Sequence, residues 1–403
     1  MAITFEEFRT AFQRNITTPQ GHDYARLVHR WSPNEEGKPL LVVEPLLEKD
    51  VSWAIRYANL NNVEVAVVAG GHSFMGASSS NGGMQIDLRC VKQVYVENER
   101  FGADGILSVQ GGASIGFFGW LLGGGAGWAM GKYGYAVDSA LSARVALASG
   151  EVVTASLDEN PNLFWALRGA GYNFGVVTSL KLRVEACPHR IFFALLAYQT
   201  SEFEALIAAS AEYAKTQGGE DSLGIIYGTQ DAFGGPGESM LLILYYHGHD
   251  EAEARRRFKP VMDIPHMPLR CGMEWLTAAC DLVESTIPYT RRYADSTAMA
   301  DMSFDALKPA LRKCAPGTDK AEDEDEAIRL CKDIISEIHG KQEQILGLRD
   351  HRWGSVYPNG ALLPGTEASY VFGDRYPRLQ EVKAKYDPGN FFHKKHPIEP
   401  LKR

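Results

Sequence analysis

Two glycine-rich stretches are the parts of this sequence best suited to hold a cofactor. The first, Gly70-Gly71-His72-Ser73, ends a run of β-branched and small residues, and the second, Gly123-Gly124-Gly125-Ala126-Gly127, follows farther along the chain. Glycine lets the backbone approach a ligand closely, and successive backbone N–H groups can bind a phosphate. The two stretches together predict loops that lie against a flat, phosphate-bearing cofactor, with the His72 side chain in contact with it. The alternative is two ordinary turns and one exposed histidine.

The standard phosphate-binding and hydrolytic motifs do not occur in the sequence. A GxxxxGK[ST] loop fails around Gly131-Lys132, because its first glycine falls on Ala126 and its last position on Tyr133. GxGxxG fails between Gly169 and Gly175, where the final glycine comes one residue late. Neither GxSxG nor HExxH is found. The sequence therefore does not support a P-loop NTPase, a Rossmann dinucleotide fold, a serine hydrolase or a zinc hydrolase.

Size and composition indicate a globular protein of two domains. The 403 residues are 45% apolar and 23% charged. The net charge of −9 argues against nucleic acid or an acidic membrane surface as a partner. The six cysteines are widely spaced, which favours free thiols in a reducing compartment over structural zinc. Neither a secretory signal nor a membrane-spanning segment is seen, so a cytoplasmic location is expected.

Helices and strands of the first half must position the two loops. Apolar residues recur at helical spacing over 50–59, and the buried-strand pattern of 63–69 leads directly into Gly70. Pro161 is expected in the first turn of a helix with an Asp or Asn cap before it. Further strands are predicted at 40–44, 84–88, 93–97, 105–110, 143–148, 152–156 and 175–184, and a short helix at 5–12.

The sequence pattern changes around Cys187-Pro188, and we place a domain boundary there. Strand and helix patterns then follow one another. Strands are predicted at 191–198, 222–227 and 239–247, and helices at 201–215, 250–261, 273–283, 304–314, 322–339 and 377–385. From these patterns alone the fold class is α+β, with a glycine-lined pocket.

Several ordered motifs add a family resemblance. Gly70-Gly71-His72-Ser73, Met84 to Leu88 and Val109 to Ala113 resemble successive signatures of the FAD-linked oxidases of the vanillyl-alcohol-oxidase superfamily, in the berberine-bridge-enzyme-like branch. The stretch from Asn173 to Thr178 and the tail from Tyr386 to Phe392 continue the resemblance. It implies a two-part FAD-binding domain (residues 1–186 and 346–403) and an inserted substrate domain (187–345) whose antiparallel sheet is covered by helices.

The resemblance also implies roles for individual residues. His72 would bond covalently to the flavin 8α-methyl group, and an imidazole is a good nucleophile near neutral pH. Many relatives have a second bond from a cysteine, but the corresponding stretch, Gly112 to Gly116, contains none, so a single attachment is predicted. The remaining predicted cofactor contacts are Gly70, Gly71, Ser73, Gly123, Gly124, Gly125, Gly127, Gly175 and Val177.

Tyr357 and Asn359 resemble the family's Y-x-N motif. They predict a tyrosine that helps remove a substrate proton and an asparagine that orients it. The alternative for Tyr357 is one more aromatic side chain at a domain interface. The resemblance thus implies hydride transfer from a small organic substrate, expected to be a secondary metabolite, to flavin N5, with O2 as electron acceptor and H2O2 as product. A non-redox isomerase or cyclase and a flavin-free protein are the alternatives, and the oligomeric state is left open.

The chain departs from the family pattern in two places. After Ala113 it lacks a helix and a strand that relatives have, and after Met302 it lacks further strands of the substrate sheet. The first departure would affect the wall of the flavin site next to Gly123.

Overall fold

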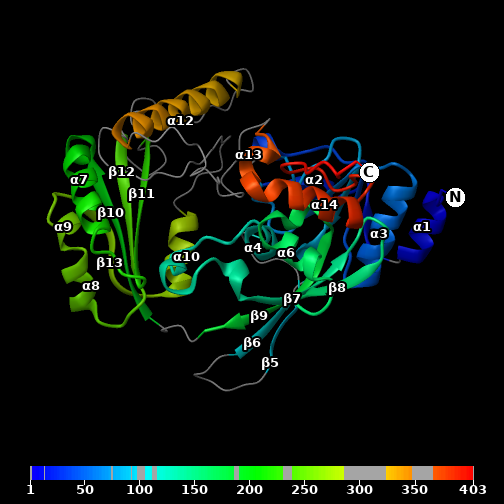
Figure 1. Ribbon diagram of the computed structural model, residues 1–403, viewed down its shortest axis with the longest axis horizontal. Coiled ribbons are helices and arrows are strands. Elements are labelled where there is room, and N and C mark those ends of the chain that lie inside the picture. Colours follow the sequence, from blue (N-terminus) through cyan, green and yellow to red (C-terminus); the bar gives the residue numbers. More distant parts are fainter. Residues whose placement is uncertain are drawn as a thin grey trace.

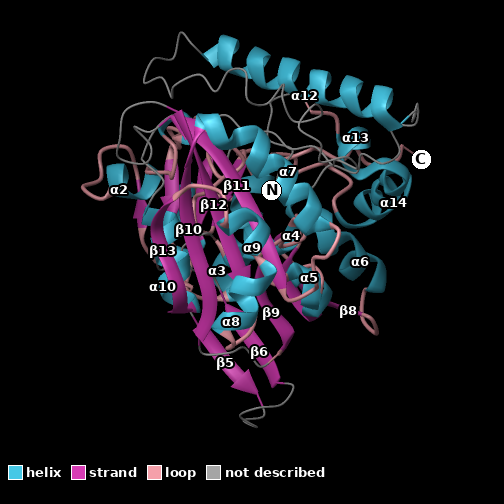
Figure 2. Ribbon diagram, turned by 90° about the vertical axis from the view of Figure 1, so that its left-hand side faces the viewer, coloured by secondary structure: helices cyan, strands magenta, loops and turns pink. Residues whose placement is uncertain are grey.

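The computed structural model describes residues 2–12, 14–73, 76–91, 93–97, 105–110, 116–185, 190–229, 238–285, 324–346 and 366–402. Within these residues the strands form three sheets, and helices cover them (Figures 1 and 2). The result is the mixed α+β architecture that the sequence predicts.

The smallest sheet leads into the loop that contains His72. Its order is β1-β2-β4-β3, with β1 antiparallel to β2 and the other pairs parallel. The strands are β1 (Ile16–Thr17), β2 (Leu41–Val43), β3 (Val65–Val68) and β4 (Met84–Asp87). Helices α1 (Phe5–Phe12), α2 (Tyr24–Val28) and α3 (Glu48–Leu60) accompany them. Val51, Ala54, Ile55 and Ala58 of α3 are buried in one cluster with Phe8, which is the predicted one-sided stripe.

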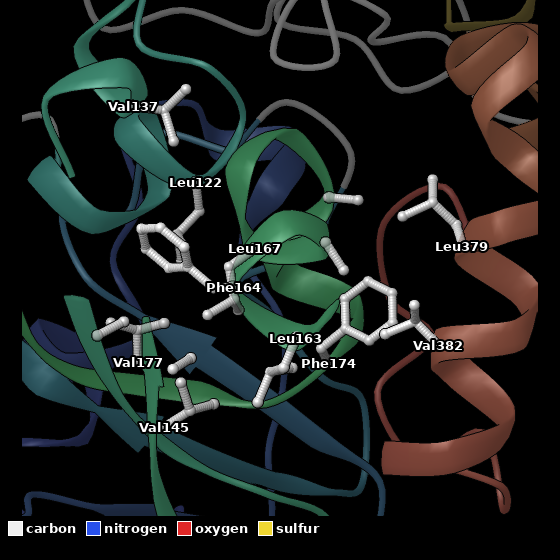
Figure 3. Packing of buried hydrophobic residues seen from close by; sticks show 14 of the residues in the cluster. Leu122, Val137, Val145, Leu163, Phe164, Leu167, Phe174, Val177, Leu379 and Val382 are labelled. Carbon is white, nitrogen blue, oxygen red and sulfur yellow. The ribbon is translucent and has the colours of Figure 1, made fainter. Parts of the chain in front are cut away.

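The second sheet is five-stranded and fully antiparallel, in the order β5-β6-β9-β7-β8. Its strands are β5 (Gln93–Glu97), β6 (Gly105–Gln110), β7 (Ala140–Ala146), β8 (Val152–Ser156) and β9 (Val176–Val184). The helices near it are α4 (Phe117–Leu122), α5 (Met130–Tyr133), α6 (Pro161–Ala170), α13 (Ala368–Phe372) and α14 (Tyr376–Tyr386). Figure 3 shows Leu163 and Phe164 of α6 packed between strand residue Val177 and Val382 of α14. The C-terminal segment therefore shares a core with the N-terminal half.

The third sheet is antiparallel, in the order β11-β12-β10-β13, and its two central strands are buried on both faces. Its strands are β10 (Arg190–Gln199), β11 (Asp221–Thr229), β12 (Glu238–Tyr246) and β13 (Met267–Trp275). The helices around it are α7 (Phe203–Ala214), α8 (Glu251–Arg257), α9 (Lys259–Met262), α10 (Leu276–Ser285) and α12 (Glu324–Leu346). Phe192 and Leu244 pack with residues of α7, α8 and α9. Phe193 and Tyr245 point to the opposite face, where α10 and Trp128 pack.

The structure corrects two element predictions. Residues 273–275 of the predicted helix 273–283 belong to β13, and the helix α10 begins only at Leu276. The predicted helix 250–261 is two helices that meet at Phe258, because Pro260 lies at the start of the second and cannot continue the hydrogen-bond ladder of the first. The predicted helix 304–314 lies outside the described residues.

Among the residues that the structure describes, no helix is long and apolar enough to cross a membrane. The same residues contain no group of three or more His, Cys, Asp or Glu side chains that could hold a metal ion.

Candidate active site

The loop that follows β3 is held in a fixed conformation. Gly71 has a φ of +76°, in the left-handed region that favours glycine. The backbone N–H of Trp31 donates to the carbonyl of Gly71 over 3.2 Å. The Trp31 ring stacks on the half-buried His72 imidazole, with ring centroids 5.5 Å apart. These contacts orient the loop and the imidazole that it carries.

Gly116, which precedes α4, packs directly against this loop. Its φ is +75°, and a Cβ added there would lie only 2.4 Å from the Gly70 nitrogen. The backbone before the second glycine cluster is thereby placed beside the first. Gly116 is not among the residues predicted from the sequence, and the signal that could have identified it is a glycine just before a short apolar helix.

Replacing Gly116 with alanine should displace the loop of Gly70 to Ser73 and lower the amount of bound flavin. The ratio of flavin to protein absorbance after purification measures this. Gly373→Ala is the matched control, because Gly373 also has a positive φ but nothing within 4 Å of an added Cβ. Equal flavin contents in the two variants would show that the close approach of Gly116 does not shape the site.

A cavity of about 1090 Å³ lies beside the two loops. Seven of the ten predicted cofactor residues line it: Gly70, Gly71, His72, Ser73, Gly127, Gly175 and Val177. Aromatic side chains form much of the remaining wall. They are Trp31, Phe118, Trp120, Trp128, Tyr133, Tyr135, Tyr172 and Tyr245. His247, Leu276 and Cys280 line it as well, so the cavity lies between the second and third sheets.

The other three predicted residues, Gly123, Gly124 and Gly125, do not line this cavity. They form the turn after α4, where the carbonyls of Gly124 and Gly125 accept backbone hydrogen bonds from Val137 and Ala136. A Cβ on Gly125 would lie 2.6 Å from the Ala136 Cβ. The structure gives these glycines a packing role, and their contact with a cofactor stays a prediction.

Gly175 permits a close approach of two strands at the cavity wall. A Cβ there would lie 2.6 Å from Val145 Cγ1 and 2.7 Å from the Ala146 carbonyl oxygen. The backbone that enters β9 can therefore lie flat against β7. Val177, two residues later, is buried in the core and also lines the cavity.

Polar groups near the His72 loop fit a phosphate-bearing cofactor. Ser78 lines the cavity, and its Oγ is buried without a hydrogen-bond partner among the described residues. The Arg30 guanidinium, only 2% exposed, lies behind the loop and donates to the Ser78 carbonyl and to Gln85 Oε1. Burial lowers the pKa of Arg30 to about 10, so it is charged at neutral pH. A hydroxyl donor in the cavity lining and a positive charge behind the loop both favour the binding of a phosphate.

The C-terminal segment closes one side of the cavity. Phe392, His393, Lys394 and Lys395 line it. The Lys395 Nζ lies 4.9 Å from the centre of the Tyr172 ring, and burial lowers the pKa of Lys395 to about 8. An amine with such a pKa can hold or release a proton near neutrality.

A buried ion pair fastens this segment to the rest of the site. Lys383 on α14 is fully buried, and its Nζ donates to Asp387 Oδ2 over 2.7 Å and to the carbonyls of Asn173 and Phe392. The Asp387 carboxylate also accepts from the backbone N–H groups of Phe391 and Phe392. The Asn173 side chain donates to the carbonyls of Lys395 and His396. The tail is thus bound to the backbone that leads into β9.

Tyr357 and Asn359, the two predicted catalytic residues, lie outside the described residues. Their roles stay predictions.

Known proteins resemble this chain in sequence and in fold. Residues 39–118 match a family model described as an FAD binding domain, and residues 365–399 match one described as berberine and berberine like. The FAD-linked oxidoreductase pgmH of Aspergillus terreus is 29% identical over 464 aligned positions, covering 94% of this chain and 92% of that protein. Because 464 exceeds the 403 residues of this chain, pgmH has residues without a counterpart here.

Two solved structures have the same fold. The 6-hydroxy-D-nicotine oxidase of Arthrobacter nicotinovorans has a TM-score of 0.81 at 20% identity, with 96% of this chain and 98% of that chain covered. The glucooligosaccharide oxidase of Acremonium strictum, described with a 6-S-cysteinyl, 8α-N1-histidyl FAD, has a TM-score of 0.76 at 17% identity, with 98% and 100% covered. Both likenesses concern the fold alone.

Proposed function

Because this chain belongs to the FAD-linked oxidoreductases of the berberine-bridge-enzyme-like branch, we propose that it binds FAD covalently through His72 and oxidises a small organic substrate. The observation that supports the proposal is the convergence on one cavity of Gly70 to Ser73, Gly127, Gly175 and Val177. These residues come from parts of the chain that are distant in sequence. FAD held there would supply a hydride acceptor at N5, and its reoxidation by O2 would give H2O2.

The residues of this chain bind and orient the two reactants. The His72 imidazole, held by stacking on Trp31, is the point of attachment. Ser78 Oγ and the positive charge of Arg30 favour the phosphate groups. A single attachment is proposed because no cysteine occurs between Gly112 and Gly116.

We assign the parts of the chain different tasks in this reaction. Residues 1–186 and 346–403 bind the cofactor, and residues 187–345 supply the wall that faces the substrate. The aromatic lining between them excludes water and favours a substrate with apolar surface.

Acid precipitation of the purified protein tests the proposal most directly. Flavin absorbance that stays in the pellet supports covalent attachment, and oxygen uptake with 6-hydroxy-D-nicotine (an amine) or cellobiose (an alcohol) supports oxidase activity. A colourless protein from a flavin-replete host would contradict the proposal and favour a flavin-free protein. Turnover with neither oxygen uptake nor a change in the flavin spectrum would favour an isomerase or cyclase.

Tyr357 is proposed to hydrogen-bond the substrate and assist loss of its proton, with Asn359 orienting it. Tyr357→Phe should slow flavin reduction by substrate about 100-fold, the lower range for a group that assists proton transfer, and leave the flavin spectrum intact. Stopped-flow absorbance under anaerobic conditions measures the rate. An unchanged rate would remove Tyr357 from the mechanism.

A further inference from the structure

His247 lies in the cavity wall with a tyrosine at each ring nitrogen. The Tyr133 hydroxyl is 3.0 Å from Nε2, and the Tyr245 hydroxyl is 2.7 Å from Nδ1. All three side chains line the same cavity as His72. Neither Tyr133 nor His247 was selected from the sequence, since the two residues are 114 positions apart.

The strand β12 determines where two of these groups point. Side chains alternate along a strand, so Tyr245 and His247 lie on the cavity side, whereas Tyr246 faces the helices on the other side. The Tyr245 ring packs 5.6 Å from the Trp128 ring, and the backbone N–H of His247 donates to the Glu220 carbonyl. His247 is 5% exposed and Tyr245 2% exposed, so both are held firmly.

Tyr133 reaches His247 from the cofactor side of the cavity. It ends α5, and the two rings meet edge to face with centroids 5.4 Å apart. Next to it, Lys132 forms an ion pair with Glu220 over 3.1 Å. A Cβ on Gly131 would lie 3.0 Å from the Gly219 carbonyl oxygen, so the two backbones are in close contact. Tyr133 itself is 39% exposed and lines the cavity, so its side chain is accessible to a molecule bound there.

The hydrogen bonds permit two tautomers of neutral His247, and only one of them can accept a proton from Tyr133. When the proton is on Nδ1, the Nδ1–H group donates a hydrogen bond to the Tyr245 oxygen. Nε2 is then unprotonated and accepts a hydrogen bond from the Tyr133 hydroxyl. When the proton is on Nε2, both hydrogen bonds run the other way: Nε2–H donates to the Tyr133 oxygen, and Nδ1 accepts from the Tyr245 hydroxyl. A tyrosine with an ordinary pKa near 10 can take a substrate proton near neutral pH only if it gives its own to a base.

We propose that Tyr133 and His247 are the proton-accepting unit of the oxidation, with Tyr245 holding His247 in the Nδ1–H tautomer. This rests on the proposed function. As hydride leaves the substrate carbon for oxidised flavin, the substrate O–H or N–H bond breaks. That proton moves to the Tyr133 oxygen, and the Tyr133 proton moves to His247 Nε2, which leaves an imidazolium. Tyr133 is the catalytic residue, and His247 acts through it.

Burial makes His247 suited to this task. It lowers the pKa of His247 from its ordinary value of 6.5, Lys132 lowers it further, and Glu220 raises it. Within the part of the chain that the structure describes, Tyr133 and Tyr245 are the other titratable groups hydrogen-bonded to the ring. His247 is consequently neutral at pH 7. The rate of flavin reduction should rise with pH through the pKa of His247, below 6.5, and be constant above it.

The tautomer can be measured without any substrate. Long-range ¹H–¹⁵N NMR of ¹⁵N-labelled holoprotein distinguishes Nδ1–H from Nε2–H, and the spectrum of His247→Gln identifies the His247 signals. The proposal expects Nδ1–H in the parent protein. A proton on Nε2 would overturn it, whatever the outcome of turnover experiments.

Anaerobic flavin reduction by 6-hydroxy-D-nicotine or cellobiose, followed against pH, provides the kinetic test. Tyr133→Phe and His247→Gln should each slow reduction about 100-fold, and His247→Gln should remove the acidic limb of the profile. Tyr246→Phe, on the opposite face of β12, should change neither the rate of flavin reduction nor its pH profile. Tyr357→Phe should slow the reaction but keep the limb.

If the acidic limb of the pH profile is kept in His247→Gln and lost in Tyr357→Phe, then Tyr357 accepts the substrate proton. That result would contradict the proposal. Flavin content and spectrum of each variant report on folding and cofactor binding. If the parent protein binds no flavin, the proposed function is wrong. The NMR measurement still shows which ring nitrogen of His247 carries the proton.

Discussion

Replacing His72 with alanine should abolish acid-stable flavin in the purified protein. The imidazole is the proposed nucleophile for the flavin methyl group, and Trp31 stacks on it from one side. The remaining loop and Ser78 Oγ still favour the phosphate groups, so the variant should bind FAD reversibly. We therefore expect yellow protein whose colour passes entirely into the acid supernatant.

His22→Ala is the matched control for this experiment, because the His22 side chain is fully exposed and does not line the cavity. It should keep all its flavin in the pellet. Acid-stable flavin in His72→Ala would place the covalent bond on another residue. Loss of all flavin, bound or released, would assign His72 a role in retention beyond the covalent bond.

Replacing Lys383 with methionine should destabilise the protein by about 3–5 kcal/mol, the cost of leaving a buried charge without its partner. The Asp387 carboxylate would stay buried, and the carbonyls of Asn173 and Phe392 would lose a donor. Methionine fills a similar volume, so the effect is one of charge and hydrogen bonding. The shift in the denaturation midpoint in urea measures it.

Lys385→Met on the same helix is the control, since Lys385 is exposed and contacts only the Tyr386 ring among the interactions described. It should change stability by less than about 0.5 kcal/mol. Adding Asp387→Leu to Lys383→Met should recover part of the loss, because the unpaired charge is then gone. Equal midpoints for the two lysine variants would mean that the ion pair does not hold the tail.

Helices and strands that are determined by the residues within their own segment could be predicted from the sequence. The helix at 5–12 and the strands at 93–97 and 105–110 have the predicted bounds, because their apolar spacing or β-branched content lies within the segment itself. The strand β13 was not predicted. It contains Pro268 and exposed residues along most of its length, and it exists because it pairs with β10 along its edge, a contact that no local pattern records.

The candidate site divides in the same way. Gly70 to Ser73 could be predicted because the motif is contiguous, and the loop lines the cavity. Gly116, Ser78 and His247 could not, because each acts through a neighbour that only the folded chain supplies. The placement of Tyr133 beside His247 depends on the contact of Gly131 with Gly219, which joins the two halves of the cavity.

The attachment of the tail through Lys383 and Asn173 affects when the site can form during synthesis. Phe392 to Lys395 line the same cavity as His72 but leave the ribosome long after it. At bacterial or eukaryotic elongation rates the interval is on the order of tens of seconds. Throughout that time the His72 loop can be folded while one wall of the cavity has not yet been translated. Any cofactor or substrate that needs the closed cavity therefore meets it only when translation of this segment is over.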